Sequence, residues 1–372
     1  FWAYYVERMD DRIWVDADDV WCVDCGLAYG QLTPNANLTA SSARGDGSIG
    51  AYNVIFGGSG YTNPTARIVA PEGSGAEPIF QLSGGAIIGA TAFFQGSGYF
   101  SGAQVAISDD TGSGAVVEPL IYQRATFTAD APVFASTRVG DVIRMDNCVA
   151  SVVQLLDAYR VLGQFVEPIT DTVPNDPFAT PKVATAGNWR ISTPTTVVHG
   201  LDHLEGMEVS ILADGGTGQI LRNITVRNGQ VNLLIPASLI VVGLPYTVQV
   251  QTMYLEPPSA TTTQGRRKNI YNLTVRVVGS RGWQAGANQP DASTQPYGAT
   301  VPWTNMVEIP ERGPTLPPGN FIPLTTGDRF TDITAGWANN GQIAIQQENP
   351  LPLQLVALVA NLEVGDSVSA DE

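Results

Sequence analysis

One stretch decides the fold of this 372-residue chain, and it reads MEVSILADGGTGQILRNITVRNGQVNLLI from Met207 to Ile235. Apolar and polar residues alternate around two turn signals, Asp214-Gly215-Gly216 and Asn228-Gly229. A period of two is typical of strands that bury one face. Asn-Gly suits a hairpin turn because both of its central residues need a positive φ. The stretch therefore predicts antiparallel strands that are joined by tight turns.

The same pattern continues toward the C-terminus. Tyr246–Gln251 and Tyr271–Val277 alternate in the same way and predict strands with their apolar side chains inward, while Leu351–Val359 predicts a buried final strand. Cys148–Leu162 fits either a helical stripe or a strand, and the strand signals around it favour a strand. With 39 glycines, 25 prolines and 15% charged residues, we expect an all-β chain. It should hold several small antiparallel sheets in sandwich-like or propeller-like units.

An internal repeat interrupts this pattern. Gly58–Tyr61 (GSGY) recurs as Gly96–Tyr99, and Gly73–Ala76 (GSGA) recurs as Gly112–Ala115, about 38 residues further on. We predict an inserted two-repeat β module over residues 45–122, between an N-terminal part of the core (1–44) and the main β domain or domains (123–372). A surface insertion of this kind is well tolerated. We expect the module to serve as a spacer or packing surface and not as a protruding binding domain, because a fold does not fix a function.

Charge, hydropathy and cysteine content exclude several classes. The formal net charge is −16, which argues against tight binding of phosphates because that requires clustered Lys and Arg. The chain has no run of 18 apolar residues, so we expect no membrane insertion. The start, Phe1–Tyr5, has neither the basic leader nor the cleavage site of a signal peptide. Cys22, Cys25 and Cys148 are too few for a disulfide framework, which favours reduced thiols made in a cytoplasm.

Two groups of residues have a spacing that metal ligands can have. His199 and His203 are four apart, but glycines flank them and no third ligand is evident, so a turn or hydrogen-bonding role is favoured. The Cys22–Cys25 pair has CxxC spacing without the second pair that a zinc ribbon needs, which favours buried structural thiols.

The remaining motifs are weaker. Asp16, Asp18 and Asp19 resemble a calcium loop but lack its glycine and its distant glutamate. Asp10-Asp11 is a carboxylate pair that would serve glycoside hydrolysis only across a cleft. Gly57–Gly60 lacks the lysine of a phosphate loop. The basic run Arg266–Lys268 has too few charges for strong phosphate binding, and we expect it to be solvated or to contact another subunit. We therefore expect no enzyme activity and no catalytic, cofactor-binding or metal-ligating residues.

Several blocks spread along the chain carry a family resemblance. The strongest are Gly200–Gly206 (GLDHLEG), Leu212–Gly215 (LADG) and Val242–Tyr246 (VGLPY). The others are Tyr5–Arg12, Trp21–Asp24, Val139–Arg144, Arg266–Lys268 and Pro350–Leu353. Together they resemble the tail nozzle proteins of short-tailed bacteriophages, also called tail tubular protein B. Those proteins are usually much longer, so the chain resembles their C-terminal part or a compact variant. The Gly-rich repeat resembles modules inserted in many phage structural proteins.

The resemblance implies a structural virion protein that is assembled in the bacterial host cytoplasm and located in the tail. It implies a homo-oligomer, generally a hexameric ring, whose channel conducts DNA during genome ejection. Its implied partners are other tail proteins: an adaptor, fibres or a tip. Six copies would carry a formal charge of about −96, which suggests an acidic lumen that repels phosphates. The alternative is a carbohydrate-binding or polysaccharide-degrading tail fibre or spike, or, third, a secreted β-rich adhesin.

Overall fold

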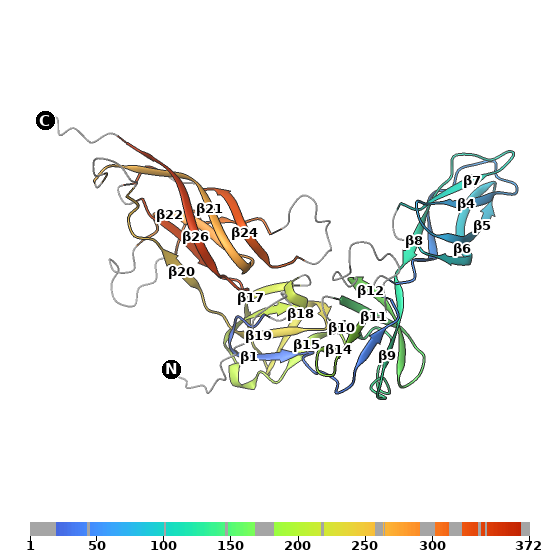
Figure 1. The fold of residues 1–372 in the computed structure, drawn as a ribbon, viewed down its shortest axis with the longest axis horizontal. Coiled ribbons are helices and arrows are strands. Elements are labelled where there is room, and N and C mark those ends of the chain that lie inside the picture. Colours follow the sequence, from blue (N-terminus) through green and yellow to red (C-terminus); the bar gives the residue numbers. More distant parts are fainter. Residues whose placement is uncertain are drawn as a thin grey trace. The chain divides into compact units, whose positions relative to one another are not determined.

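The computed structural model confirms the all-β prediction (Figure 1). It describes residues 20–42, 45–99, 102–145, 148–167, 182–216, 219–256, 263, 265–290, 302–311, 322–333, 336–338 and 341–365. Over these ranges the regular structure consists of antiparallel strands and two short 3-10 turns, η2 (Asp202–Leu204) and η3 (Asp214–Gly216).

The chain divides into two compact units. One contains Thr195–Glu372 with the N-terminal residues to Tyr29, and the other contains Gly30–Pro194. The expected boundaries after residues 44 and 122 stay a prediction, and in this division residues 123–194 group with the 45–122 module. The reason is strand pairing: β2 (Leu38–Ala40), before the module, pairs with β9 (Arg124–Ala129), after it.

A seven-stranded antiparallel sheet forms the base of the Gly30–Pro194 unit. Its order is β13 (Lys182–Ala184), β2, β9, β12 (Arg160–Glu167), β11 (Cys148–Leu155), β10 (Val142–Met145), β14 (Trp189–Ser192). The Phe127 and Phe165 rings meet in its core at 5.7 Å between centroids, and the buried Trp189 indole donates to the Ala36 carbonyl at 2.6 Å. The Cys148–Leu162 segment, ambiguous in sequence, is β11 followed by a turn into β12.

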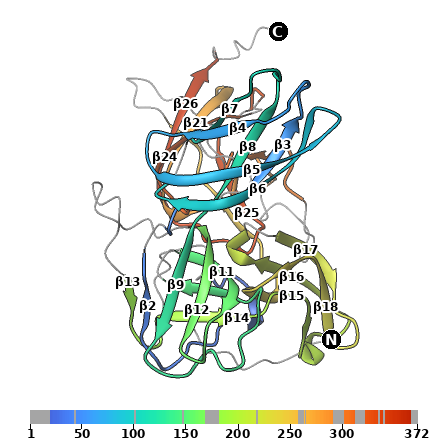
Figure 2. The ribbon, with the colours of Figure 1, turned by 90° about the vertical axis from the view of Figure 1, so that its right-hand side faces the viewer.

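The Gly-rich module contains six strands that pair between the two repeats (Figure 2). The pairs are β3 (Ser48–Phe56) with β8 (Val116–Tyr122), β4 (Thr65–Val69) with β7 (Gln104–Ser108), and β5 (Ser74–Ser83) with β6 (Ala86–Ser97). Each pair takes one strand from each repeat. The two repeats are therefore intertwined around one core, which contains Ile49 and its counterpart Ile87.

Two buried tyrosines hold the repeats together reciprocally. The Ala115 N–H donates to the Tyr61 hydroxyl at 3.0 Å, and the Ala76 N–H donates to the Tyr99 hydroxyl at 3.2 Å. Each tyrosine belongs to one repeat and each alanine to the other. The module therefore has an internal pseudo-twofold arrangement, which explains why the GSGY and GSGA motifs occur twice.

The central sheet of the other unit has the order β1 (Asp24–Tyr29), β19 (Ile240–Leu244), β16 (Glu208–Ala213), β17 (Gln219–Thr225). It shares a core with the pair β15 (Thr195–His199) and β18 (Gln230–Ala237). Asn228 and Gly229 adopt the expected positive φ, 53° and 64°. The Glu205 carboxylate accepts both of their N–H groups. The Arg227–Gln230 bridge closes this predicted hairpin turn, and beyond it β17 pairs with β16 and β18 with β15.

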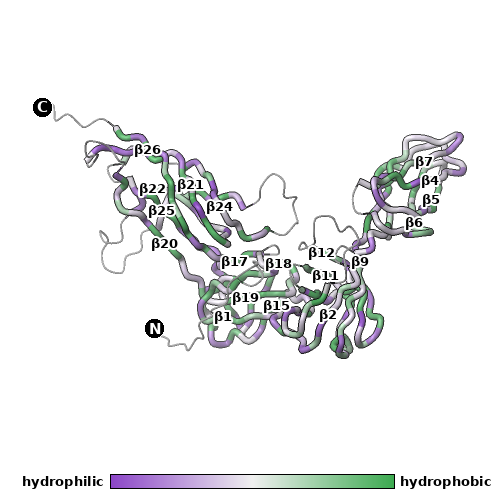
Figure 3. Tube along the Cα trace, in the orientation of Figure 1, coloured by the Kyte–Doolittle hydropathy of each residue, from purple (hydrophilic) through white to green (hydrophobic). Residues whose placement is uncertain are grey.

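Two further sheets form a C-terminal sandwich around a common core (Figure 3). One has the order β24 (Thr325–Asp332), β21 (Lys268–Ser280), β26 (Leu355–Val364). The other has the order β20 (Val248–Gln251), β25 (Ile343–Gln347), β22 (Gln284–Ala287), β23 (Val307–Glu308).

Three expectations about the sandwich strands are wrong. Val248 and Val250 are 36% and 42% exposed because β20 lies at a sheet edge. Tyr271 points outward because the register shifts between Ile270 and Asn272, although the later apolar residues of β21 are buried. The final strand begins at Leu355 and buries one face only.

Candidate functional site

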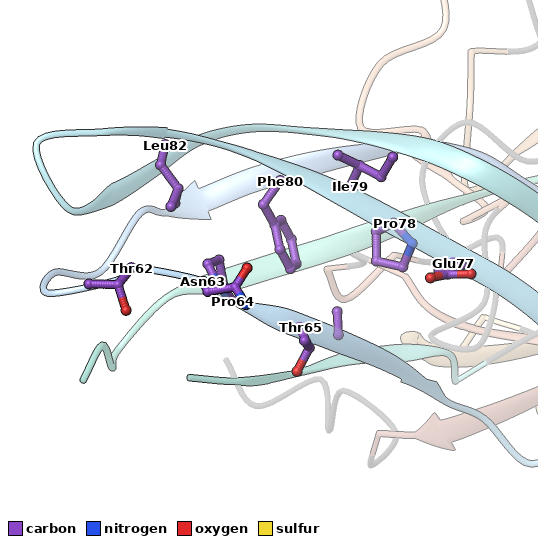
Figure 4. Close-up of a pocket in the computed structure, with 10 residues that line it drawn as sticks. Thr62, Asn63, Pro64, Thr65, Glu77, Pro78, Ile79, Phe80 and Leu82 are labelled. Carbon is purple, nitrogen blue, oxygen red and sulfur yellow. The ribbon is translucent and has the colours of Figure 1, made fainter. Parts of the chain in front are cut away.

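A groove of about 300 Å³ lies on the Gly-rich module, between the segment that enters β4 and the middle of β5 (Figure 4). β4 pairs only with β7 and β5 only with β6, so the groove follows a seam between two unpaired strand edges. Its lining residues are Thr62, Asn63, Pro64, Thr65, Ala66, Glu77, Pro78, Ile79, Phe80 and Leu82. The half-buried Phe80 ring extends from β5 toward Asn63 and Pro64 of the facing segment.

Asp109 holds one wall of the groove in place. Its carboxylate accepts the N–H groups of Thr62 at 3.2 Å and Asn63 at 2.7 Å, and those of Thr111 and Gly112 at 2.9 and 2.8 Å. These donors, first of all the Thr111 N–H, hold the pKa of Asp109 well below its usual range. An ionised Asp109 carboxylate therefore fixes this wall. Because Asp109 binds the backbone N–H of Asn63, the Asn63 side chain is not used by this contact.

The groove combines an apolar surface with a few free polar groups. The Asn63 amide and the Glu77 carboxylate are exposed, and neither side chain hydrogen-bonds another described residue. The Thr65 hydroxyl, in contrast, already donates to the Ser108 carbonyl at 3.2 Å. Glu77 is the single acid among the lining residues, so the groove has no pair of facing carboxylates for glycoside hydrolysis. The groove therefore offers an apolar wall and exposed hydrogen-bonding groups.

The histidines and cysteines occupy structural positions. His203 lies in η2 and its Nε2 contacts the Cys25 carbonyl at 3.0 Å, which agrees with a hydrogen-bonding role. Cys22 and Cys25 pack against different core clusters, and no disulfide joins Cys22, Cys25 or Cys148 to another described residue. Burial raises the pKa of Cys22 to about 11, so this thiol is protonated and unreactive at neutral pH.

Among the other predicted motifs, one expectation is corrected. Arg267 is exposed, but Lys268 is only 1% exposed, so the basic run is not a uniformly solvated face. The alternation of β21 turns Lys268 inward, where its side chain lies against Gly341. Gly57–Gly60 forms a turn whose backbone packs closely against Ser113 and Ala115 of the other repeat, and Ser59 forms a β-bridge with Ser113. The acidic motifs at Asp10-Asp11 and at Asp16, Asp18 and Asp19 lie outside the described residues.

Sequence reasoning missed the groove. Asn63, Glu77 and Phe80 match no motif. Asn63 lies in the segment that enters β4, and Glu77 and Phe80 lie on β5, which does not pair with β4. The available signal was the repeat itself, whose shared GSGY and GSGA motifs mark the turns that pack between the two copies. Within the described ranges, no cluster of three or more His, Cys, Asp or Glu residues is placed to hold a metal ion.

Comparisons with known proteins leave the family open. No protein-family model matches the chain, and a search of curated proteins finds no significant relative. None of the helices in the described part of the chain is long and apolar enough to cross a membrane.

Proposed function

We propose that this chain is a structural subunit of a ring-shaped tail nozzle of a short-tailed bacteriophage. In this role it forms part of the channel for genome ejection and a platform for neighbouring tail proteins. The proposal starts from the sequence blocks that resemble the nozzle family.

The observation that carries the proposal is the convergence of these blocks in space. One core cluster contains Cys22 and Val23 from the N-terminal block, Leu212 from the central block and Leu351 from the last block. The Tyr246 hydroxyl, at the end of a fourth block, hydrogen-bonds the Cys22 thiol. Chance matches scattered over more than 300 residues have no reason to pack on one another. The convergence therefore supports reading the blocks as one structural element.

The exposed apolar residues support assembly with further copies. On the outer face of β24–β21–β26, Phe330 and Val359 flank Thr274 in one cross-strand row and are 71% and 60% exposed. Apolar side chains gathered on one sheet face are typical of protein contact surfaces. A closed ring needs two different faces of each subunit, and this face is a candidate for one of them.

Electron microscopy of the purified chain, with mass measurement in solution, tests the proposal. We expect closed rings of six copies with an axial channel, and stronger assembly as salt screens the charge of −16 per chain. The rings should not retard duplex DNA in a gel. A monomer at all concentrations and salt levels, or a trimeric spike, would contradict the proposal.

A further inference from the structure

The pseudo-twofold arrangement of the Gly-rich module provides an internal comparison for the groove. Glu77 lies opposite Phe94 in one strand pair, and Val116 lies opposite Phe56 in the other. Both pairs also have register shifts at matching places. Phe56 and Phe94 occupy the same place in the two repeats, so Glu77 corresponds to Val116. By the same register, Phe80 corresponds to Pro119.

Several positions that the fold requires are identical in the two repeats. A Cβ on Gly58 would lie 2.5 Å from the Ser113 carbonyl oxygen, and one on Gly96 would lie 2.5 Å from that of Ser74. Both positions are therefore glycine, and both reciprocal hydrogen bonds have a tyrosine as acceptor. Glu77 and Phe80, in contrast, are replaced by Val and Pro in the other repeat. The fold does not require the Glu77 carboxylate, which is exposed. Phe80 packs partly against the module core and also lines the groove.

We propose that the β4–β5 groove binds a neutral oligosaccharide. A sugar ring has an apolar C–H face and a rim of hydroxyl groups. The Phe80 ring and Pro64 offer the apolar surface, while the Glu77 carboxylate accepts hydrogen bonds from hydroxyl groups and the Asn63 amide both donates and accepts. Asp109 fixes the backbone at Asn63 through the 2.7 Å hydrogen bond, so this wall is ordered before the ligand arrives.

Charge selects the class of glycan. The module spans residues 45–122 and contains six acidic residues and one basic residue, Arg67. Its field repels uronates, sialic acids and sulfated sugars, and Glu77 would face an anionic ligand directly inside the groove. A neutral glycan meets no such repulsion. This inference concerns the module alone and does not rest on the proposed ring assembly.

Affinity gel electrophoresis of the full chain tests the proposal. The gels contain hydroxyethylcellulose, soluble starch or galactomannan, with polygalacturonate as the anionic comparison. We expect at least one neutral polysaccharide to retard the chain and polygalacturonate to leave its migration unchanged. Glu77→Val places the counterpart residue in the groove without disturbing a strand. It should weaken retardation about tenfold, because a hydrogen bond to a charged group is lost.

Two controls keep the result interpretable. Glu118→Val removes an exposed carboxylate from β8, outside the groove, and with the same change in charge it should leave retardation unaltered. Asn63→Ala should weaken retardation without changing the melting temperature. The proposal is overturned if no neutral polysaccharide retards the chain, if Glu118→Val weakens binding as much as Glu77→Val, or if polygalacturonate binds equally well.

Discussion

Replacing Arg281 by methionine is expected to destabilise the C-terminal sandwich strongly. The Arg281 side chain is 3% exposed and its Nε donates to the Glu311 carboxylate at 2.9 Å. Its Nη1 donates to the Gly215 carbonyl at 2.8 Å, in the turn that follows β16. Arg281 therefore joins the sandwich to the central sheet of the same unit. Methionine keeps much of the volume but leaves Glu311 and the Gly215 carbonyl without this donor.

The expected loss follows from burial. Removing one partner of a buried ion pair costs about 3–5 kcal/mol, because the other charge stays desolvated. Glu311 retains 18% side-chain exposure, which relieves part of that penalty and places the loss near the lower end, at about 3 kcal/mol. With a urea m-value of about 3 kcal/mol/M, the unfolding midpoint should fall by about 1 M. Tryptophan fluorescence follows this transition, since Trp283 is 2% exposed in the same core and contributes to the signal.

Two further variants test whether burial of the Arg281–Glu311 pair causes the loss of stability. Arg276→Met removes a surface pair with Asp328, whose side chains are 58% and 39% exposed, and should leave the midpoint nearly unchanged because water screens that pair. Glu311→Gln, added to Arg281→Met, should restore part of the loss because no unpaired charge remains. An equal midpoint for Arg281→Met and Arg276→Met would refute the assigned role of burial.

Four other outcomes are expected. Tyr61→Phe and Tyr99→Phe should each cost about 1 kcal/mol in denaturation, since each leaves one part-buried N–H without its acceptor, and clearly unequal losses would contradict the pseudo-twofold arrangement. Folding lowers the pKa of Asp109, so its stabilisation is present above the unfolded pKa of about 3.9 and declines as the pH falls below it. Asp109→Asn should therefore flatten the acid limb of a melting-temperature profile, and a parallel limb would argue against this. Gly229→Ala should cost about 1–3 kcal/mol in thermal unfolding, because φ is +64° and the new Cβ would lie 2.4 Å from a carboxylate oxygen. Phe330→Ser should reduce oligomer mass in sedimentation without lowering the melting temperature, because the ring is 71% exposed; an unchanged mass would exclude this face from the interface.

Local sequence determined most of the secondary structure. Alternating residues predicted strands, and Asn228-Gly229 predicted a positive-φ turn, because both signals act within a few residues. The errors arose where a neighbour in space decides the outcome. Val250 alternates like a buried residue but lies on an edge strand, and Tyr271 is turned outward by a bulge. Lys268 belongs to a basic run that suggests solvent, yet strand alternation turns it into the interior.

The candidate groove depends wholly on distant pairing. Asn63 lies just before β4 and Glu77 on β5, two strands that do not pair with each other, and Asp109 reaches Asn63 across 46 positions of the sequence. No spacing rule links such residues, because their separation in the chain says nothing about which strands become neighbours. The repeat was visible in sequence, but its consequence was not: identical motifs pair between copies and leave non-identical residues free to line a groove.

By itself, then, the sequence determined the all-β character, the turns and the duplicated GSGY and GSGA motifs, since these depend on backbone sterics and on periodicity. Tertiary structure alone decided which strands are edges, how the repeats intertwine and where Arg281 is buried. It also brought Cys22, Leu212 and Leu351 into one cluster. These outcomes depend on long-range burial and hydrogen bonding, and local alternation carries no information about either.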